Sequence, residues 1–176
     1  EPDIVVVGKT IAGGIPTAAY GFTEELGRKV AAVIPPELCD IGGIGGTLAA
    51  NALSMHVMKA VLEEILTQEF YDKNIPLAAR FNQGVQSVIS EFDLPWNTVQ
   101  LGCRTEYWFR KEPARNGGQA EAAVDFELDQ YMHLASLNRG ILMTPFHNMA
   151  LICAETTEAD IDRHTEVFRE IVRNIL

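Results

Sequence analysis

The chain opens with short apolar runs separated by glycine-rich turns, and longer amphipathic segments follow. Residues Ile4–Val7 form an unbroken β-branched run, which predicts a strand buried on both faces, as in a parallel sheet. Residues 16–22 predict a second short strand that rejoins the same sheet. The first part of the chain is therefore expected to contribute two strands of one sheet.

Helical signals begin after these strands. Thr23 precedes two glutamates, which is the pattern of a helix N-cap, and the helix must end before Pro35 because proline cannot continue it. Residues 37–46 contain too many glycines for regular structure and predict a loop whose backbone can approach a ligand closely. Thr47 then predicts the start of a long helix that reaches about Gln68, with apolar residues at helical spacing.

The remaining residues alternate helices and short strands, a pattern typical of a small α+β domain. Gly140 predicts the end of one helix, and a Thr157-x-x-Asp160 capping pattern predicts the start of the last one. The expected elements are a helix at about 73–90, a strand or strand pair at 98–110, a loop at 112–118, a helix at 119–138, strands at 141–144 and 149–154, and a final helix.

Composition and charge exclude several classes of function. At 176 residues the chain can form a real hydrophobic core, and its net charge of −10 argues against nucleic-acid binding. No apolar run approaches membrane-spanning length. Cys39, Cys103 and Cys153 lack metal-type spacing, and a sparse, odd cysteine count is typical of a reduced cytoplasmic protein. We expect a cytoplasmic protein that binds no metal, nucleic acid or membrane.

Lys9 is the first candidate for chemistry. It follows the predicted strand and precedes a threonine and the Gly13-Gly14 pair. A lysine brought from a buried strand into a glycine-rich bend lies in apolar surroundings, where desolvation disfavours the ammonium and frees a nucleophilic amine. This is the chemistry of a Schiff-base lysine. From the residues alone, a solvated lysine at the end of a strand remains the alternative.

Two segments carry a resemblance to a known family. Gly8–Pro16 (GKTIAGGIP), with Ala19–Gly21 after it, is similar to the lysine segment of class III pyridoxal-phosphate-dependent aminotransferases. Gly45–Ser54 (GGTLAANALS) resembles the family's G-T-x-x-x-N-P-L-A stretch, with Ala52 in place of the proline. Two segments in this order and at this spacing make the signal specific. Within the family, the chain resembles glutamate-1-semialdehyde aminomutase-like enzymes and their aminotransferase relatives.

The resemblance implies a fold and a domain organisation. The chain is expected to be α/β and to form the C-terminal half of a fold-type-I transferase subunit, with the N-terminal half as its partner. Residues 1–68 would be the end of the cofactor-binding large domain, with a remnant of its sheet and a linking helix. Residues 69–176 would be the small C-terminal α+β domain.

The resemblance also assigns roles to residues. Lys9 would hold pyridoxal 5′-phosphate as a Schiff base and move the substrate's α-proton, so that an amino group passes between an amino acid or amine and a 2-oxo acid. Gly46 and Thr47 would contact the cofactor phosphate of the neighbouring subunit, which makes the active site a property of a homodimer. His147 and Asn148 lie on the loop that faces the substrate in the family.

Several alternatives stay open. From the residues alone, Thr47 fits a simple helix cap and His147 a hydrogen-bonded loop histidine. Intramolecular transfer, as in glutamate-1-semialdehyde 2,1-aminomutase, is the rival reaction, although Asn148 or Met149 stands where that enzyme's loop has a glutamate. A non-catalytic homologue that acts as an interaction module is the alternative from another class.

The other polar residues have structural interpretations. His56, His133 and His164 fall on predicted helices and are expected to be surface residues or satisfied core residues. Arg104 and Glu106 fall on one side of a predicted strand, where we expect them to pair without a catalytic role.

Overall fold

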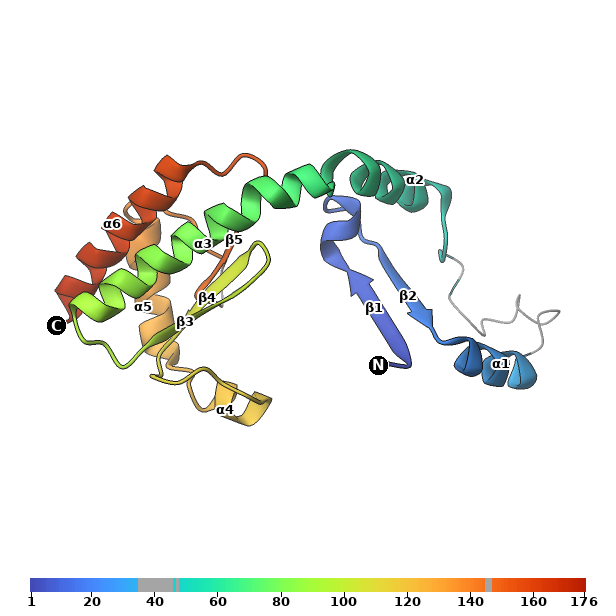
Figure 1. Ribbon diagram of the computed structural model, residues 1–176, viewed down its shortest axis with the longest axis horizontal. Coiled ribbons are helices and arrows are strands. Elements are labelled where there is room, and N and C mark those ends of the chain that lie inside the picture. The colour runs from blue at the N-terminus through green and yellow to red at the C-terminus, as the bar shows by residue number, and fades with distance from the viewer. Residues whose placement is uncertain (35–45, 47, 145–146) are drawn as a thin grey trace. The chain divides into compact units, whose positions relative to one another are not determined.

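The computed structural model describes residues 1–34, 46, 48–144 and 147–176 (Figure 1). The chain divides into two compact units, an N-terminal unit, Glu1–Thr67, and a C-terminal unit, Gln68–Leu176. Each unit contains its own small sheet. Over the described residues, no helix combines the length and the apolar character needed to cross a membrane.

The N-terminal unit begins with a β-hairpin. Strand β1 (Ile4–Gly8) pairs antiparallel with β2 (Ala18–Phe22), with Val6 opposite Tyr20. The existence of both strands confirms the prediction, but their arrangement corrects it. The apolar side chains of β1 are exposed rather than buried, and Val6 is 70% exposed. The cause is that β1 pairs with a single strand among the described residues, so both faces of the hairpin stay open.

The first helix, α1 (Glu24–Val33), is capped as predicted. The Thr23 hydroxyl accepts a backbone N–H of the first turn at 3.3 Å, which satisfies one of the donors that a helix N-terminus leaves free. The helix ends before Pro35, as expected. The glycine-rich loop predicted at 37–46 lies outside the described residues except for Gly46.

The start predicted for the next helix is wrong. Helix α2 (Ala52–Ala60) is capped by Asn51, whose Oδ1 accepts the Ser54 N–H at 3.0 Å. Ala50, just before the cap, has a φ of 51°, which a right-handed helix does not allow. The asparagine amide is the preferred cap here, so the helix begins at Ala52 and not at Thr47.

The end of this helix also differs from the prediction. A single π-helical turn, η3 (Val61–Ile65), follows α2 directly, and the Leu66 N–H donates to the Val61 carbonyl at 2.9 Å. Val61 is 7% exposed, and together α2 and η3 pack against the 3₁₀ turn η1 (Lys9–Ala12) that joins the two strands. The helical segment therefore supports the turn that carries the candidate lysine.

The C-terminal unit packs helices against one face of a three-stranded antiparallel sheet, the α+β arrangement expected from the sequence. The strand order is β3-β4-β5, and Figure 1 shows α3 and α6 side by side. The elements are α3 (Gln68–Glu91), β3 (Asn97–Leu101), β4 (Arg104–Trp108), α4 (Gly117–Glu121), α5 (Phe126–Leu137), β5 (Met149–Leu151) and α6 (Glu158–Ile175).

Polar and aromatic contacts fix the sheet against the helices. Asn82 of α3 accepts hydrogen bonds from the hydroxyls of Thr98 (2.5 Å) and Thr105 (3.2 Å), so this network bridges one helix and two strands. Tyr107 is 4% exposed, and its ring lies 5.0 Å from that of Phe168 in α6. Because the two threonine hydroxyls are hydrogen-bonded to Asn82 and the aromatic rings pack together, these contacts favour one arrangement of the sheet against the helices.

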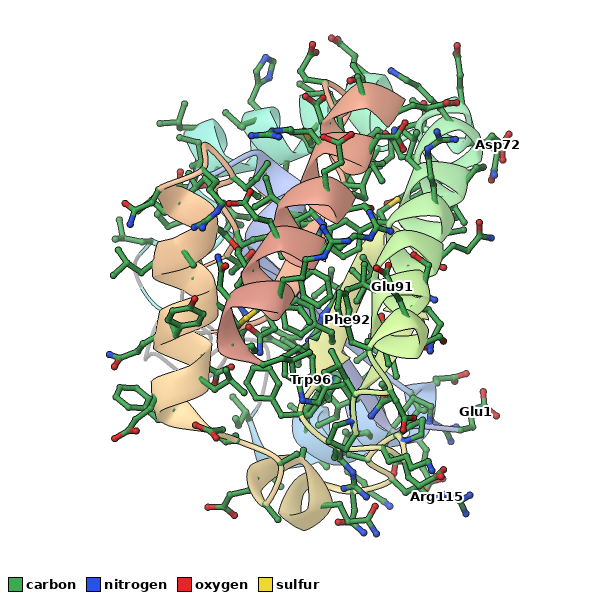
Figure 2. All side chains as sticks on the ribbon, turned by 90° about the vertical axis from the view of Figure 1, so that its left-hand side faces the viewer. Glu1, Asp72, Glu91, Phe92, Trp96 and Arg115 are labelled. Atoms are coloured by element: carbon green, nitrogen blue, oxygen red, sulfur yellow. The ribbon has the colours of Figure 1, made fainter. Side chains whose placement is uncertain are left out.

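The end of α3 is tied to α6 by charge and packing. Figure 2 shows Glu91, Phe92 and Trp96 where the chain leaves α3. Glu91 accepts hydrogen bonds from Arg169 (2.7 Å) and Arg173 (3.4 Å), and the Arg173 guanidinium lies 5.8 Å from the centre of the Phe92 ring. Trp96 is 8% exposed in the core. The segment after α3 is therefore held at its start by the contacts of Glu91 and Phe92 and at its end by the burial of Trp96.

The single helix predicted at 119–138 is wrong. The structure has α4 and α5 in this region, because Asp125 caps a new helix by accepting the Leu128 N–H at 3.0 Å. An aspartate side chain is a favourable N-cap, so a new helix begins after Asp125 although the apolar pattern continues through this position in the sequence.

The strand predicted at 141–144 does not form. The Ile141 N–H donates instead to the Ser136 carbonyl at 3.0 Å, and Gly140 has a φ of 82°, so this segment closes the end of α5. The start of α6 is as predicted. Thr157 and Asp160 form a reciprocal capping box, with the Thr157 N–H 2.8 Å from the Asp160 carboxylate.

Candidate functional site

Lys9 lies at the end of β1, at the first position of the turn η1. Its φ is 62°, in the left-handed region that residues other than glycine rarely adopt. Gly8 before it is extended, and Gly13 at the end of the turn is also left-handed, with a φ of 56°. A left-handed residue with a side chain costs about 1–2 kcal/mol, so the surrounding structure must hold it in place.

The turn is held by the residues behind the lysine. Ile11 and Ala12 are 7% and 0% exposed. A Cβ added at Gly13 would lie 3.2 Å from Val61 Cγ2, so the turn rests on η3 with no room for a side chain. The packed rear of the turn fixes the backbone of Lys9, while its side chain is exposed.

Lys9 borders a hollow on the outer side of the turn. The residues that line it are Lys9, Thr10, Gly14, Ile15, Pro16 and Thr17. Gly14 leaves one wall open, because nothing lies within 4 Å of the position of a Cβ there. The Thr17 hydroxyl oxygen is buried and has no hydrogen-bond partner among the described residues. A primary amine at the edge of a hollow is a group that can react with a carbonyl compound.

One expectation for Lys9 is not met. The sequence predicted apolar, desolvated surroundings, whereas the side chain is exposed in the part of the chain that the structure describes. The reason is that all of the described walls of the hollow come from one strand connection, Lys9–Thr17, which leaves the outer side open. The position of the lysine at the strand end agrees with the prediction.

The predicted phosphate-contacting residues precede α2. The Gly46 carbonyl accepts the Ala49 N–H at 2.8 Å, and a Cβ at Gly46 would meet nothing within 4 Å. Thr47 lies outside the described residues. The free N–H groups of helix α2 begin at Ala52. The phosphate contacts of Gly46 and Thr47 remain a prediction.

His147 and Asn148 lie in the C-terminal unit, just before β5. The Asn148 side-chain amide donates to Asp129 Oδ1 of α5 at 2.5 Å, and the backbone carbonyl of Asn148 accepts the Tyr107 N–H at 3.1 Å. These two contacts fix Asn148 between a helix and a strand, while His147 is exposed. Both residues line a small cavity together with Asp129 and Glu106.

The charged groups of this cavity are acidic. Burial raises the pKa of the Asp129 carboxyl, although its hydrogen bond from Asn148 opposes the shift. Glu106 is 8% exposed and accepts a hydrogen bond from Arg104 at 2.7 Å, which confirms the predicted pair. Burial also raises the pKa of Tyr107 far above its usual range, so its phenol stays neutral. The walls therefore suit a cationic or hydrogen-bond-donating group.

The family model described as Aminotransferase class-III matches residues 1–172 of the chain. The chain belongs to the class III aminotransferase family. It is 31% identical over 175 residues to a glutamate-1-semialdehyde 2,1-aminomutase from Thermomicrobium roseum. The matched region covers 99% of the chain and 39% of that relative. A second such relative, from Desulfitobacterium hafniense, is 29% identical over 176 residues, with the same coverage. The chain thus spans about two fifths of the length of these class III relatives.

Solved structures agree with this assignment. A glutamate-1-semialdehyde-aminomutase from Pseudomonas aeruginosa PAO1 is 40% identical with a TM-score of 0.94, covering 100% of this chain and 40% of that one. A variant of the Pseudomonas enzyme has been solved in complex with PMP. A β-phenylalanine aminotransferase from Variovorax paradoxus, at 23% identity and a TM-score of 0.75, covering 98% of this chain and 38% of its own, shares the fold. The matches confirm the predicted fold class, the C-terminal part of a fold-type-I transferase.

The sequence did not predict two residues that line these cavities, Thr17 beside the hollow of Lys9 and Asp129 beside His147 and Asn148. Thr17 had a usable signal, because pairing the two predicted strands brings the ends of the strand connection, Lys9 and Thr17, to the same end of the hairpin. Asp129 had none, since it lies on a helix and meets Asn148 only through the tertiary fold. The described residues contain no group of three or more His, Cys, Asp or Glu side chains that could hold a metal ion.

The helical histidines of the class III chain are partly as expected. His56 is exposed and His133 half-buried, whereas His164 is 5% exposed and packs against Phe81 in a tilted arrangement with ring centroids 4.2 Å apart. Its Nδ1 has no hydrogen-bond partner within the described part of the chain, so the expectation of a satisfied core histidine is wrong. Burial lowers the pKa of His164 to about 4.

Proposed function

We propose that the complete protein is a pyridoxal-phosphate-dependent aminotransferase in which Lys9 holds the cofactor. The enzyme would move an amino group between an amino acid or amine and a 2-oxo acid. The position of Lys9 supports this proposal. Lys9 begins a turn in which Ile11 and Ala12 are buried, and it borders a hollow. The class III family model matches the segment that contains it.

The residues around Lys9 fit the cofactor. Pyridoxal phosphate supplies, when bound, an aldehyde carbon on an electron-withdrawing ring that stabilises negative charge formed on the substrate. Lys9 Nζ would hold that aldehyde carbon and later take the proton from the substrate's α-carbon. The open wall at Gly14 leaves room for a planar group, and the packed Ile11-Ala12 pair keeps the amine at one place on the strand end.

The rest of the site would come from other parts of the assembly. We assign residues 1–68 to the end of the cofactor-binding large domain and residues 69–176 to the small domain. Gly46 and Thr47 would contact the cofactor phosphate of the second subunit of a homodimer, and the N-terminal half of the same subunit would supply further contacts. The exposed side chains of β1 support this assignment, because they are free to be covered by such neighbours.

His147 and Asn148 are the proposed substrate contacts. Both line the acidic cavity of the C-terminal unit, where Asn148 is already fixed by Asp129. A cavity of this charge suits the amino group of a donor substrate better than its carboxylate. We place the enzyme in the cytoplasm, on the ground of its sparse cysteines.

An aminomutase is the second candidate function, favoured by the 31% and 40% identities to proteins named as glutamate-1-semialdehyde aminomutases. Such an enzyme returns the amino group to another carbon of the same substrate. The two reactions differ in one requirement. A mutase turns over without an added 2-oxo acid, whereas a transaminase stops after one half-reaction unless an oxo acid accepts the amino group.

The test of the proposal is covalent labelling of the complete protein. Incubation with pyridoxal phosphate, reduction with borohydride and peptide mass spectrometry should place the reduced adduct on Lys9. Lys9→Arg should lose the adduct, and Lys29→Arg, which changes a lysine on α1, should keep it. A wild-type adduct on another lysine, or no adduct at all, would contradict the proposal, and the second result would favour a non-catalytic interaction module.

A further inference from the structure

We infer that the hydroxyl of Thr17 positions the amine of Lys9 in the hollow. This inference rests on the proposed function, because it concerns how Lys9 is held for its reaction with the cofactor aldehyde. Thr17 would be a positioning residue, since it acts through the lysine.

The hairpin brings the two residues together. Gly8 is the last residue of β1 and faces Ala18 of β2 in the antiparallel register. Lys9 and Thr17 are the residues that directly adjoin this last pair, at the point where the strands separate into the turn. Both residues line the same hollow. The lysine side chain is long and flexible enough to reach a residue that lines the same hollow.

Thr17 needs a partner that the described residues do not provide. Its hydroxyl oxygen is buried and forms no hydrogen bond with any of them. A buried hydroxyl without a partner destabilises a protein more than an apolar group of the same shape would. An unpaired buried hydroxyl is therefore a candidate for a role that involves a ligand or a mobile side chain.

Lys9 is able to provide the partner. Its ammonium carries three donors on a flexible stem, and its side chain is exposed at the edge of the hollow. The Thr17 oxygen is buried in the observed rotamer, and the inferred contact requires another staggered χ1 rotamer, in which the oxygen faces the hollow. In that rotamer the Lys9 amine donates to the Thr17 oxygen, and the hydrogen bond restricts the lysine to conformations that hold the amine over the hollow.

The expected consequence is a faster reaction of Lys9 with an aldehyde. In this step the Lys9 nitrogen bonds to the aldehyde carbon and the aldehyde oxygen leaves as water, and borohydride then adds a hydride to that carbon to give a stable secondary amine. Loss of one positioning hydrogen bond should slow the capture by about two- to tenfold.

The experiment measures capture by the cofactor-free complete protein. Pyridoxal phosphate is added, samples are quenched with borohydride at increasing times, and the labelled Lys9 peptide is quantified by mass spectrometry. Thr17→Val, which keeps the shape and removes the hydroxyl, should slow labelling, while Thr17→Ser should retain the wild-type rate within about twofold. Thr17→Ala should slow labelling as much as Thr17→Val does. The two variants differ in shape, so equal slowing in both would point to the missing hydroxyl rather than to misfolding of one variant.

Two results would overturn the inference. One is wild-type labelling kinetics in Thr17→Val and Thr17→Ala, and the other is equal slowing in Thr17→Ser and Thr17→Val. A purely structural threonine predicts the first result, together with an unchanged or higher unfolding temperature for Thr17→Val. Failure of the proposed function is distinguishable, because wild-type protein would then carry no label on Lys9.

Discussion

Gly84 of α3 and Thr165 of α6 touch where the two helices pack together. A Cβ added at Gly84 would lie 3.2 Å from both the Cβ and the Cγ2 of Thr165, and its hydroxyl would be closer still. Thr165 cannot turn away freely, because its hydroxyl donates to the Ile161 carbonyl at 3.1 Å. The glycine therefore allows the closest approach between the two main helices of the C-terminal unit.

Gly84→Ala should destabilise the protein. Overpacking costs typically 1–3 kcal/mol, which exceeds the gain of about 1 kcal/mol that alanine brings to a helix interior. We expect a net loss of about 1 kcal/mol or more in urea denaturation of the complete protein. In a Thr165→Ala background the same change should destabilise less, because the hydroxyl and Cγ2 of Thr165 are removed while its Cβ, 3.2 Å from the added Cβ, remains. Stabilisation by Gly84→Ala in the wild-type background would contradict this packing argument.

His164 should make stability depend on pH. Its pKa is lowered to about 4 in the folded state, whereas a histidine in the unfolded chain has a pKa of about 6.5. The unfolded state therefore binds more protons between these values, so stability is complete above about pH 6.5 and is lost as the pH falls toward 4. The expected loss is about 3 kcal/mol.

The measurement is the free energy of unfolding between pH 7 and pH 4. His164→Leu should remove most of the slope, because it removes the group that binds the proton. His56→Gln, which replaces an exposed histidine of α2, controls for the loss of a histidine as such. An equal slope in wild type and His164→Leu would refute the assignment of the slope to His164.

The elements that the sequence predicted well depend on local signals. The start of α6 follows from Thr157 and Asp160, two residues within one turn whose hydrogen bonds satisfy each other. The start of α2 was misplaced because Thr47 and Asn51 are both good caps, and only the backbone at Ala50 excludes the longer helix. Competing local signals of similar strength need the tertiary structure to decide between them.

The candidate site divides in the same way. The place of Lys9 at the strand end was predictable, because the β-branched run and the glycine pair are adjacent in sequence. The contacts of Thr17 with the hollow and of Asn148 with Asp129 depend on strand pairing and on helix packing. Burial of His164 against Phe81 likewise depends on how two distant helices meet. Such relationships leave no periodic signal in one sequence.

Asp129→Asn should stabilise the protein at neutral pH. Burial raises the pKa of the Asp129 carboxyl, so ionisation is less favourable in the folded state than in the unfolded state. The folded state is therefore destabilised as the pH rises and the carboxyl must ionise. An asparagine at this position does not ionise, and its amide oxygen can still accept the hydrogen bond from Asn148.

The check is a comparison of unfolding midpoints for both proteins at neutral and acidic pH. The advantage of Asp129→Asn should be present at pH 7 and should disappear at acidic pH, where the carboxyl of both states is protonated. Asp125→Asn is the matched control on the same helix start, where the side chain caps α5. An advantage that persists unchanged in acid would show that ionisation of Asp129 is not its cause.

Gly13→Ala should loosen the turn that carries Lys9, and Gly14→Ala separates the two causes. Both glycines have left-handed φ values, 56° and 99°, so alanine strains the backbone at either position, by about 1–2 kcal/mol for a left-handed residue. Only Gly13 also meets a neighbour, since its Cβ would lie 3.2 Å from Val61 Cγ2, whereas nothing lies within 4 Å at Gly14. Hydrogen exchange of the η1 amides should therefore rise more in Gly13→Ala, and Val61→Ala should restore part of the difference in that background alone. Equal exchange in the two alanine variants would mean that η3 does not support the turn.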